Sequence, residues 1–222
     1  ALEKYESDTA ASKMAILTLG RDNLRKPKYT MIRDGITLTV TYWRDADLNR
    51  KFNRGNATSV FYQSEALHQG DKTDVFYIEI ANHRNSKLLF NVRKWSIEDS
   101  NDNFYSGMNF KDLKERLTMM SRVGGLAVKN GLVQAKEILL EKQMARMEDG
   151  VSEMKDGKPG TMAGFAAFRQ VKMNGKSVIQ KILIEKAPPP DQPAGRFQLA
   201  SFEFPYFHHR GIREMQPPPM RY

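Results

Sequence analysis

The stretch of sequence that decides the fold runs from Asp74 to Tyr105 and reads DVFYIEIANHRNSKLLFNVRKWSIEDSNDNFY. In its first part apolar residues recur at every second position, at Phe76, Ile78 and Ile80, which is the pattern of a β-strand with one buried face. Turn-forming residues 83–86 follow, and Leu88, Phe90 and Val92 then resume the alternation. We interpret the two halves as a β-hairpin. A lone hairpin is marginally stable in water, so a larger sheet must lie beside it.

A second clear strand lies upstream of this stretch, at residues 36–43. Ile36, Leu38, Val40 and Tyr42 fall on one face, while threonines and Trp43 fall on the other. The preceding Asp34-Gly35 pair is a favoured two-residue turn, which predicts a hairpin with residues 29–33.

Three further strands are predicted near the C-terminus, at residues 161–168, 177–186 and 197–207. Asn174-Gly175 predicts a hairpin between the first two, and the proline-rich run 187–194 is an extended connector before the third. Seven or eight short strands in all are typical of a two-sheet β-sandwich.

Residues 110–154 change character, because their apolar residues follow helical spacing. One stripe is Phe110, Leu113, Leu117 and Met120; the other is Leu140, Met144, Met147, Val151 and Met154. We interpret them as an antiparallel helical hairpin, with Gly124-Gly125 and Asn130-Gly131 between its helices. We favour packing of both stripes on each other and on the sandwich over an exposed seam for a partner.

The predicted fold class is therefore mainly β: an immunoglobulin-like two-sheet antiparallel sandwich with an inserted α-helical hairpin. The predicted division of the chain is an N-terminal extension (1–28), the sandwich (29–106 and 157–207), the helical insertion (107–156) and an extended C-terminal tail (208–222).

Composition narrows the protein's class. Of 222 residues, 40% are hydrophobic and 27% charged, and no apolar run is long enough to span a bilayer. Cysteine is absent, which excludes disulfides, thiolate metal sites and cysteine nucleophiles. The net charge of +9 is spread along the chain without a polybasic block, so we favour a mildly basic surface over a nucleic-acid groove.

The β pieces resemble the immunoglobulin-like domains of unknown function in bacterial envelope lipoproteins. Those domains run strand, asparagine-led turn, aromatic-bearing strand, acidic turn ending in tyrosine, and then a Pro-Gly-x-x-x-Gly-x-x-x-Phe strand. The matching residues here are Asn82, Phe90, Asp99, Tyr105, Pro159, Gly160, Gly164 and Phe168. Two features depart from the pattern: Asp102 or Asn103 replaces the turn glycine, and residues 106–158 interrupt the module.

The resemblance covers residues 29–105 and 159–206, and it implies an extracytoplasmic, non-catalytic module that contacts other proteins. A periplasmic or outer-membrane-associated location follows from it. The chain begins at Ala1 rather than methionine, which leaves two explanations open. One is a processed product with a signal segment or lipid-bearing residue before Ala1, and the other is a trimmed chain.

Motifs for chemistry are missing from the sequence. The four histidines are His68, His83, His208 and His209, and the adjacent pair would point to opposite faces of a strand. No phosphate-binding loop and no nucleophile elbow is present. We therefore expect no enzyme activity, no cofactor, no metal site and no small-molecule substrate.

The expected function is that of a structural or accessory subunit in a cell-envelope assembly of several proteins. The expected partner contacts are Leu140, Met144, Met147, Met215, Pro217, Pro218 and Tyr222. The alternative is a nucleic-acid-binding module, in which exposed Tyr77, Trp95 and Phe104 stack on bases while Arg84, Arg93 and Lys94 neutralise phosphates.

Overall fold

The computed structural model describes residues 28–43, 45–52, 61, 73–99, 101–120, 125–144, 149–169, 176–187 and 198–208. Its strands are β1 (Lys28–Arg33), β2 (Ile36–Trp43), β3 (Thr73–Asn82), β4 (Leu88–Leu89), β5 (Ser96–Asp99), β6 (Phe104–Met108), β7 (Gly160–Arg169), β8 (Lys176–Lys186) and β9 (Gln198–His208). Its helices are α2 (Asp45–Phe52), α3 (Phe110–Met120) and α4 (Gly125–Ile138), with short 3₁₀ helices η2 (Val92–Lys94) and η3 (Leu140–Gln143).

The described strands form one continuous antiparallel sheet of nine strands, in the order β1-β2-β3-β7-β6-β5-β8-β4, with β9 paired to β8. β9 pairs with β8 along its whole length, from Lys176↔His208 to Lys186↔Gln198. β4 and β5 therefore share the other edge of β8. The predicted mainly-β class is confirmed.

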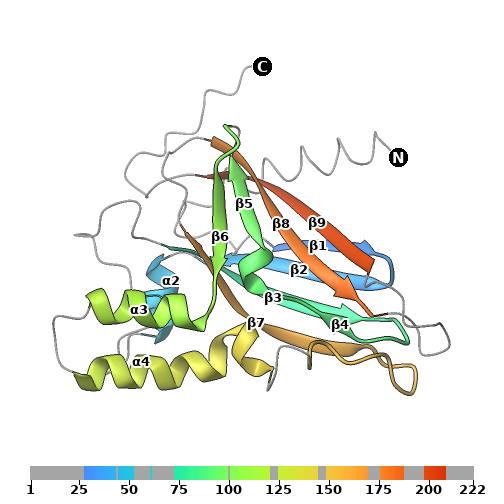
Figure 1. The fold of residues 1–222 in the computed structure, drawn as a ribbon, viewed down its shortest axis with the longest axis horizontal. Coiled ribbons are helices and arrows are strands. Elements are labelled where there is room, and N and C mark those ends of the chain that lie inside the picture. Colours follow the sequence, from blue (N-terminus) through green and yellow to red (C-terminus); the bar gives the residue numbers. More distant parts are fainter. Residues whose placement is uncertain are drawn as a thin grey trace.

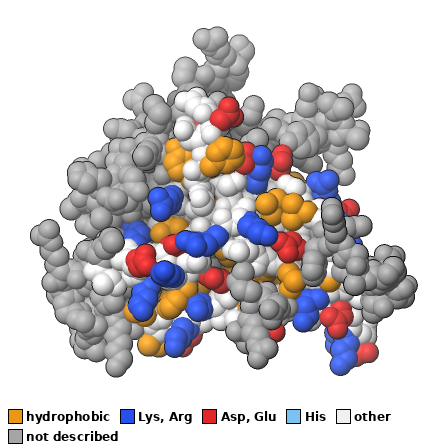
Figure 2. Space-filling view, viewed as in Figure 1, with side chains coloured by type: hydrophobic (Ala, Val, Ile, Leu, Met, Phe, Trp, Pro, Cys, Tyr) orange, Lys and Arg blue, Asp and Glu red, His pale blue; other side chains and the backbone are white. Residues whose placement is uncertain are grey.

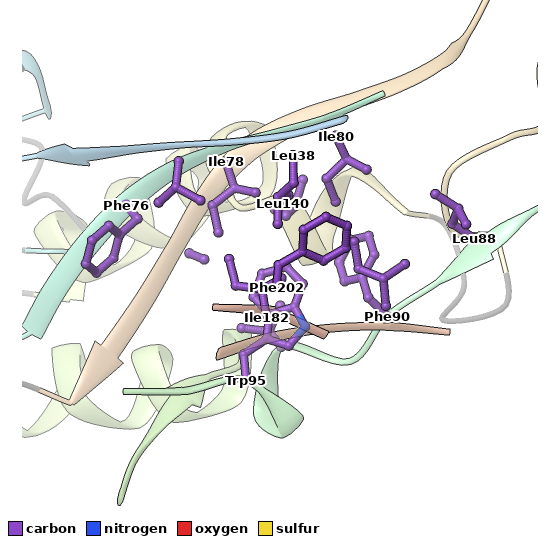
Figure 3. Packing of buried hydrophobic residues seen from close by; sticks show 14 of the residues in the cluster. Leu38, Phe76, Ile78, Ile80, Leu88, Phe90, Trp95, Leu140, Ile182 and Phe202 are labelled. Atoms are coloured by element: carbon purple, nitrogen blue, oxygen red, sulfur yellow. The ribbon is translucent and has the colours of Figure 1, made fainter. Parts of the chain in front are cut away.

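The sheet folds over so that its two halves face each other across one core (Figure 1). Figure 3 shows Leu38, Ile78 and Ile80 from β2 and β3 pointing toward Ile182 and Phe202 from β8 and β9. Because β6 pairs with both β5 and β7, hydrogen bonds link the halves. The expected division into two separate sheets is therefore not confirmed.

The hairpin predicted between residues 29–33 and 36–43 forms, as does the hairpin turn predicted at the acidic run 99–103, between β5 and β6. β1 and β2 pair from Arg33↔Ile36 outward, and positive φ at Asp34 (52°) and Gly35 (72°) gives the type I′ turn that matches strand twist.

The predicted hairpin within residues 74–92 is wrong. β3 is already paired on one edge with β2 and on the other with β7. The chain after Asn82 therefore has no free edge of β3 to return to. It crosses to the opposite half of the sheet, where Leu88 pairs with Lys186.

The predicted hairpin between residues 161–168 and 177–186 is wrong for the same reason. β7 pairs with β3 and β6, whereas β8 pairs with β4, β5 and β9. Each strand thus has both edges paired with other strands, and neither edge is left for the other strand.

The helices cover the outer face of β3 and β7, where a second apolar cluster forms. Leu48 and Phe52 of α2, Leu113 of α3, and Ala135 of α4 pack there. The helix predicted over 110–120 is confirmed.

The helix predicted over 140–154 is wrong. The second helix is instead α4, whose span includes residues that the sequence analysis placed between helices. Residues 151–154 bond to the 84–88 segment: Val151 N–H donates to Leu88 O (2.8 Å) and Met154 N–H to Arg84 O (2.8 Å). Their amides are thus used in sheet-like contacts rather than in a helix.

Leu140 and Met144, two of the expected partner contacts, lie in the main core, 0% and 7% exposed. Their side chains pack against this protein's own sheet, and we do not propose them as contacts for a partner. The segment that follows α4 thus packs into the same core as the sheet. Met147, Met215, Pro217, Pro218 and Tyr222 lie outside the described residues.

The residues that carry the family-like pattern have structural roles here. Asn82 is buried, and its amide Nδ2 donates to Ser86 O (2.8 Å) and Ser152 O (2.9 Å), which ties the turn after β3 to the segment before β7. Phe90 packs against Trp95 with ring centroids 5.2 Å apart. Gly164 lies where η3 crosses β7, because a Cβ there would come within 2.7 Å of the Leu140 backbone.

Candidate interaction surface

The described residues do not assemble a recognisable catalytic or metal centre. Among them, no three His, Asp or Glu side chains gather closely enough to hold a metal ion. The His83 ring nitrogen Nε2 lies 3.2 Å from Thr37 Oγ1 on the surface. His68 and His209 fall outside the described residues, as does the side chain of His208. Within the described part of the chain, the helices are too short or too polar to cross a membrane.

The most distinctive surface feature is the hairpin of β5 and β6, which projects from the body at the end away from α3 and α4 (Figure 1). Its strands pair at Ser96↔Ser106, Ile97↔Tyr105 and Glu98↔Phe104. Ile97 and Tyr105 face the core, so Glu98 and Phe104 point to the outside. One face of the hairpin thus packs into the core, and the other face is exposed to solvent.

The tip of this hairpin is held in place by the carboxylate of Asp99, which is buried. Asp99 Oδ1 accepts from the backbone N–H of Asn101 (2.8 Å) and of Asn103 (3.2 Å). Both carboxylate oxygens accept from Asn103 Nδ2, and Tyr105 OH donates to Oδ2 at 3.4 Å. Asp102 takes a left-handed conformation (φ 58°), which asparagine and aspartate tolerate best after glycine. The acidic turn that the sequence pattern places before Tyr105 is therefore ordered.

Phe104 is the exposed apolar residue of this tip, with 67% of its surface open. Figure 2 shows apolar side chains exposed over the upper end of β5 and β6. Beside it, Glu98 pairs with Lys181 of β8 at 2.5 Å. The hydrogen bond to Glu98 is the main cause that raises the pKa of Lys181. The hairpin thus exposes the Phe104 ring at a tip that is fixed by the Asp99 hydrogen bonds and the Glu98–Lys181 ion pair.

The aromatic platform expected for nucleic-acid binding is not assembled. Trp95 is fully buried, and its Nε1 donates to Leu183 O at 2.8 Å. Tyr77 is half-buried against Phe165, with ring centroids 5.0 Å apart. Of the three rings, Phe104 alone is exposed. Arg93 and Lys94 pair with Asp112 and Glu185 at 3.0 and 2.7 Å.

The face seen in Figure 2 carries charges of both signs, without a large patch of one sign. Figure 2 shows basic and acidic side chains interspersed over the helices and strands. The sequence-level interpretation of a solvated, mildly basic surface agrees with this face. The sequence signal that could have isolated Phe104 is its place one residue before the core residue Tyr105, directly after a turn.

Comparison with known proteins gives no family. No family model matches the chain, and no curated protein matches it. Among solved structures, a DUF4426 family protein from Pseudomonas aeruginosa PAO1 is 9% identical, with 82% of this chain and 97% of that chain covered, at a TM-score of 0.30.

Proposed function

We propose that this protein is a non-catalytic structural or accessory subunit that binds another protein of a larger assembly through the β5–β6 hairpin. The observation that carries the proposal is Phe104, 67% exposed at a tip whose turn is fixed by Asp99. The two facts together matter more than either alone, because scattered exposed apolar residues are ordinary on protein surfaces.

Energetics favour such a tip as a binding anchor. Moving a phenylalanine side chain fully out of water contributes about 1.5–3 kcal/mol. Aromatic residues placed in desolvated pockets dominate many protein interfaces. A loop already held in its bound shape loses little conformational freedom on binding, so more of this energy remains as affinity.

The chemistry around Phe104 indicates the kind of partner. Asp102, Asn101 and Asn103 are exposed at the tip, and the segment from Asp99 to Tyr105 contains no basic residue. The partner is therefore a protein with an apolar pocket whose rim carries lysine, arginine or amide donors.

The resemblance to immunoglobulin-like modules of envelope lipoproteins supports a place in the bacterial cell envelope, on the periplasmic side. Those modules have no catalytic residues, which agrees with a binding role. We infer the same immunoglobulin-like class for the folded sheet of this protein.

The test is site-specific photocrosslinking in cells that make the protein. Benzoylphenylalanine replaces Phe104 in one variant and Val133 of α4 in the control, since Val133 is also exposed (52%) but lies on a helix. We expect a discrete crosslinked protein from position 104 and none from position 133. Equal adducts from both positions, or none from position 104, would refute the proposal.

A further inference from the structure

β1 is an edge strand whose outer side has no partner among the described residues. It pairs only with β2, in a ladder from Arg33↔Ile36 to Lys28↔Thr41. The residues closing a type I′ turn form a hydrogen-bonded pair, and bonded and non-bonded pairs then alternate along an antiparallel ladder. The backbone N–H and C=O groups of Lys28, Thr30 and Ile32 therefore point away from β2.

β9, the other edge strand, meets β1 at one end only. Arg33 Nη1 donates to Ser201 O at 2.9 Å. Figure 1 shows β1 and β9 close together near the β1–β2 turn and diverging toward the start of β1. Among the described residues, the folded sheet is thus open along most of β1.

The outer face beside this edge carries exposed apolar side chains. Ile32 on β1 is 74% exposed and Leu199 on β9 is 55% exposed. An added strand along β1 would place one of its side chains next to Ile32, which is how neighbouring strands stabilise each other.

Charge at the edge disfavours a second copy of this chain as the occupant. Lys28 and Arg33 bracket β1, and positive side chains on edge strands oppose pairing of identical edges. Lys28 Nζ lies 3.2 Å from Glu79 Oε2 on β3, so the larger excess of positive charge is at the Arg33 end. Around the adjoining turn, Arg33, Arg84 and Lys186 face the single carboxylate of Asp34. The local excess of positive charge favours an occupant with carboxylates.

We propose that the open edge of β1 accepts an extended segment of another protein, bearing acidic side chains at its ends, as an added β-strand. In this mode the main-chain groups of Lys28, Thr30 and Ile32 supply affinity, and the basic residues at the edge select the sequence. It is a second binding mode, independent of Phe104, in which this protein receives a segment instead of inserting one.

The probe is a short fluorescent peptide of alternating valine and threonine with glutamate at both ends, followed by fluorescence anisotropy against the full chain. Its counterpart has lysine at both ends. We expect saturable binding of the acidic peptide. The basic peptide should bind about tenfold more weakly, because its lysines would be repelled by the basic residues beside β1. Binding of both with equal affinity, or of neither, overturns the proposal.

Backbone pairing is tested by two N-methylated forms of the acidic peptide, methylated on alternate amide sets. Only the set that faces β1 is needed for pairing, so one form loses binding and the other keeps it. Equal binding by the two forms overturns the proposal, and no variant of the protein has to fold for this test.

Protein variants locate the site. Thr30→Pro removes one outward N–H at an edge position where proline is tolerated, and Ile32→Thr removes the exposed apolar contact. Both should weaken the acidic peptide, whereas Val133→Thr, which removes an exposed apolar side chain elsewhere, should not. Phe104→Ala should leave peptide binding unchanged, which separates this proposal from the function proposed for the hairpin.

A second copy of this chain is the competing occupant of the β1 edge. Sedimentation of the wild-type protein is expected to show a monomer. A dimer that Thr30→Pro dissociates would mean that a second copy occupies the edge, and would overturn the proposal.

Discussion

Lys186 of β8 and Asp34 of the β1–β2 turn form an ion pair, with 3.0 Å between Nζ and Oδ2, that joins the two halves of the folded sheet. Lys186 is only 8% exposed, so its ammonium depends on this carboxylate. Arg84 Nη1 also donates to Asp34 O at 3.3 Å. The turn between β1 and β2, at one end of the sheet, is thus bonded to β8, which lies near the other end of the strand order.

Removing the carboxylate should cost more than removing the ammonium. Asp34→Asn leaves a buried positive charge without its partner, whereas Lys186→Met leaves a half-exposed carboxylate that water can solvate. We expect a lower urea midpoint for Asp34→Asn than for Lys186→Met. The double variant should recover part of the loss, and a double variant less stable than Asp34→Asn would contradict the pairing.

Acid should weaken the same contact. The hydrogen bond from Lys186 and then its positive charge hold the pKa of Asp34 below the ordinary value. Because the folded-state pKa is the lower one, the stabilisation is full above the ordinary pKa of about 3.9 and is lost as pH falls through the lowered value. Urea unfolding between about pH 6 and pH 2 should show a smaller acid-dependent loss in Asp34→Asn than in wild type. Equal losses would mean that Asp34 is not the titrating group.

Gln180 offers a stabilising substitution. Its side chain is fully buried on β8, and among the described residues neither its Nε2 nor its Oε1 has a hydrogen-bond partner. Gln180→Met keeps the shape and removes the desolvated amide, so we expect a gain of about 1–3 kcal/mol in unfolding free energy.

Gln134 is the matched control for that substitution. Its Nε2 donates to Phe52 O at 3.2 Å, while its Oε1, like the amide atoms of Gln180, has no hydrogen-bond partner among the described residues. Gln134→Met removes one hydrogen bond together with one unpaired acceptor, so it should gain less stability than Gln180→Met. Urea unfolding of both variants measures the contrast, and a destabilised Gln180→Met would show that the amide makes a contact worth keeping.

Gly164 should not accept a side chain. A Cβ there would meet Leu140 backbone atoms at 2.7 Å, so Gly164→Ala is expected to destabilise the fold by about 1–3 kcal/mol through overpacking. Gly157 has a left-handed backbone (φ 72°) with nothing within 4 Å of its Cβ position. Gly157→Asn should therefore change the thermal midpoint little, and a similar drop for both variants would argue against the close approach.

The β5–β6 tip should separate stability from binding. Phe104→Ala removes a ring that is already in water, so its unfolding free energy should stay within about 0.5 kcal/mol of wild type while partner binding falls. Asp99→Ala removes the acceptor for Asn101 and Asn103, and should cost about 1–3 kcal/mol. Faster hydrogen exchange at these two amides would report the loosened turn, and unchanged exchange would contradict the role given to Asp99.

Local patterns were enough to place most strands. The alternation at 36–43 and 74–82 predicted β2 and β3 with the correct buried faces, and Asp34-Gly35 predicted the β1–β2 hairpin. These features depend on neighbours within a few residues, which a single sequence displays directly.

Strand partners could not be predicted in this way. Whether β3 pairs with the strand that follows it depends on whether its edges are free, and β2 and β7 take both. The apolar spacing from Leu140 to Met154 likewise fits a helix, yet Val151 bonds to Leu88 and Leu140 fills the core. Periodicity records that residues are buried, but not which surface buries them.

The sequence by itself determined that this chain is rich in β-strands, lacks cysteine chemistry and carries a helical segment before its last strands, because composition and short-range alternation fix those properties. Only the tertiary structure decided that the strands join in one folded sheet, that Phe104 stays in water and that the outer edge of β1 has no partner among the described strands. Pairing and exposure are set by contacts between residues far apart in the chain, such as Asp34 with Lys186.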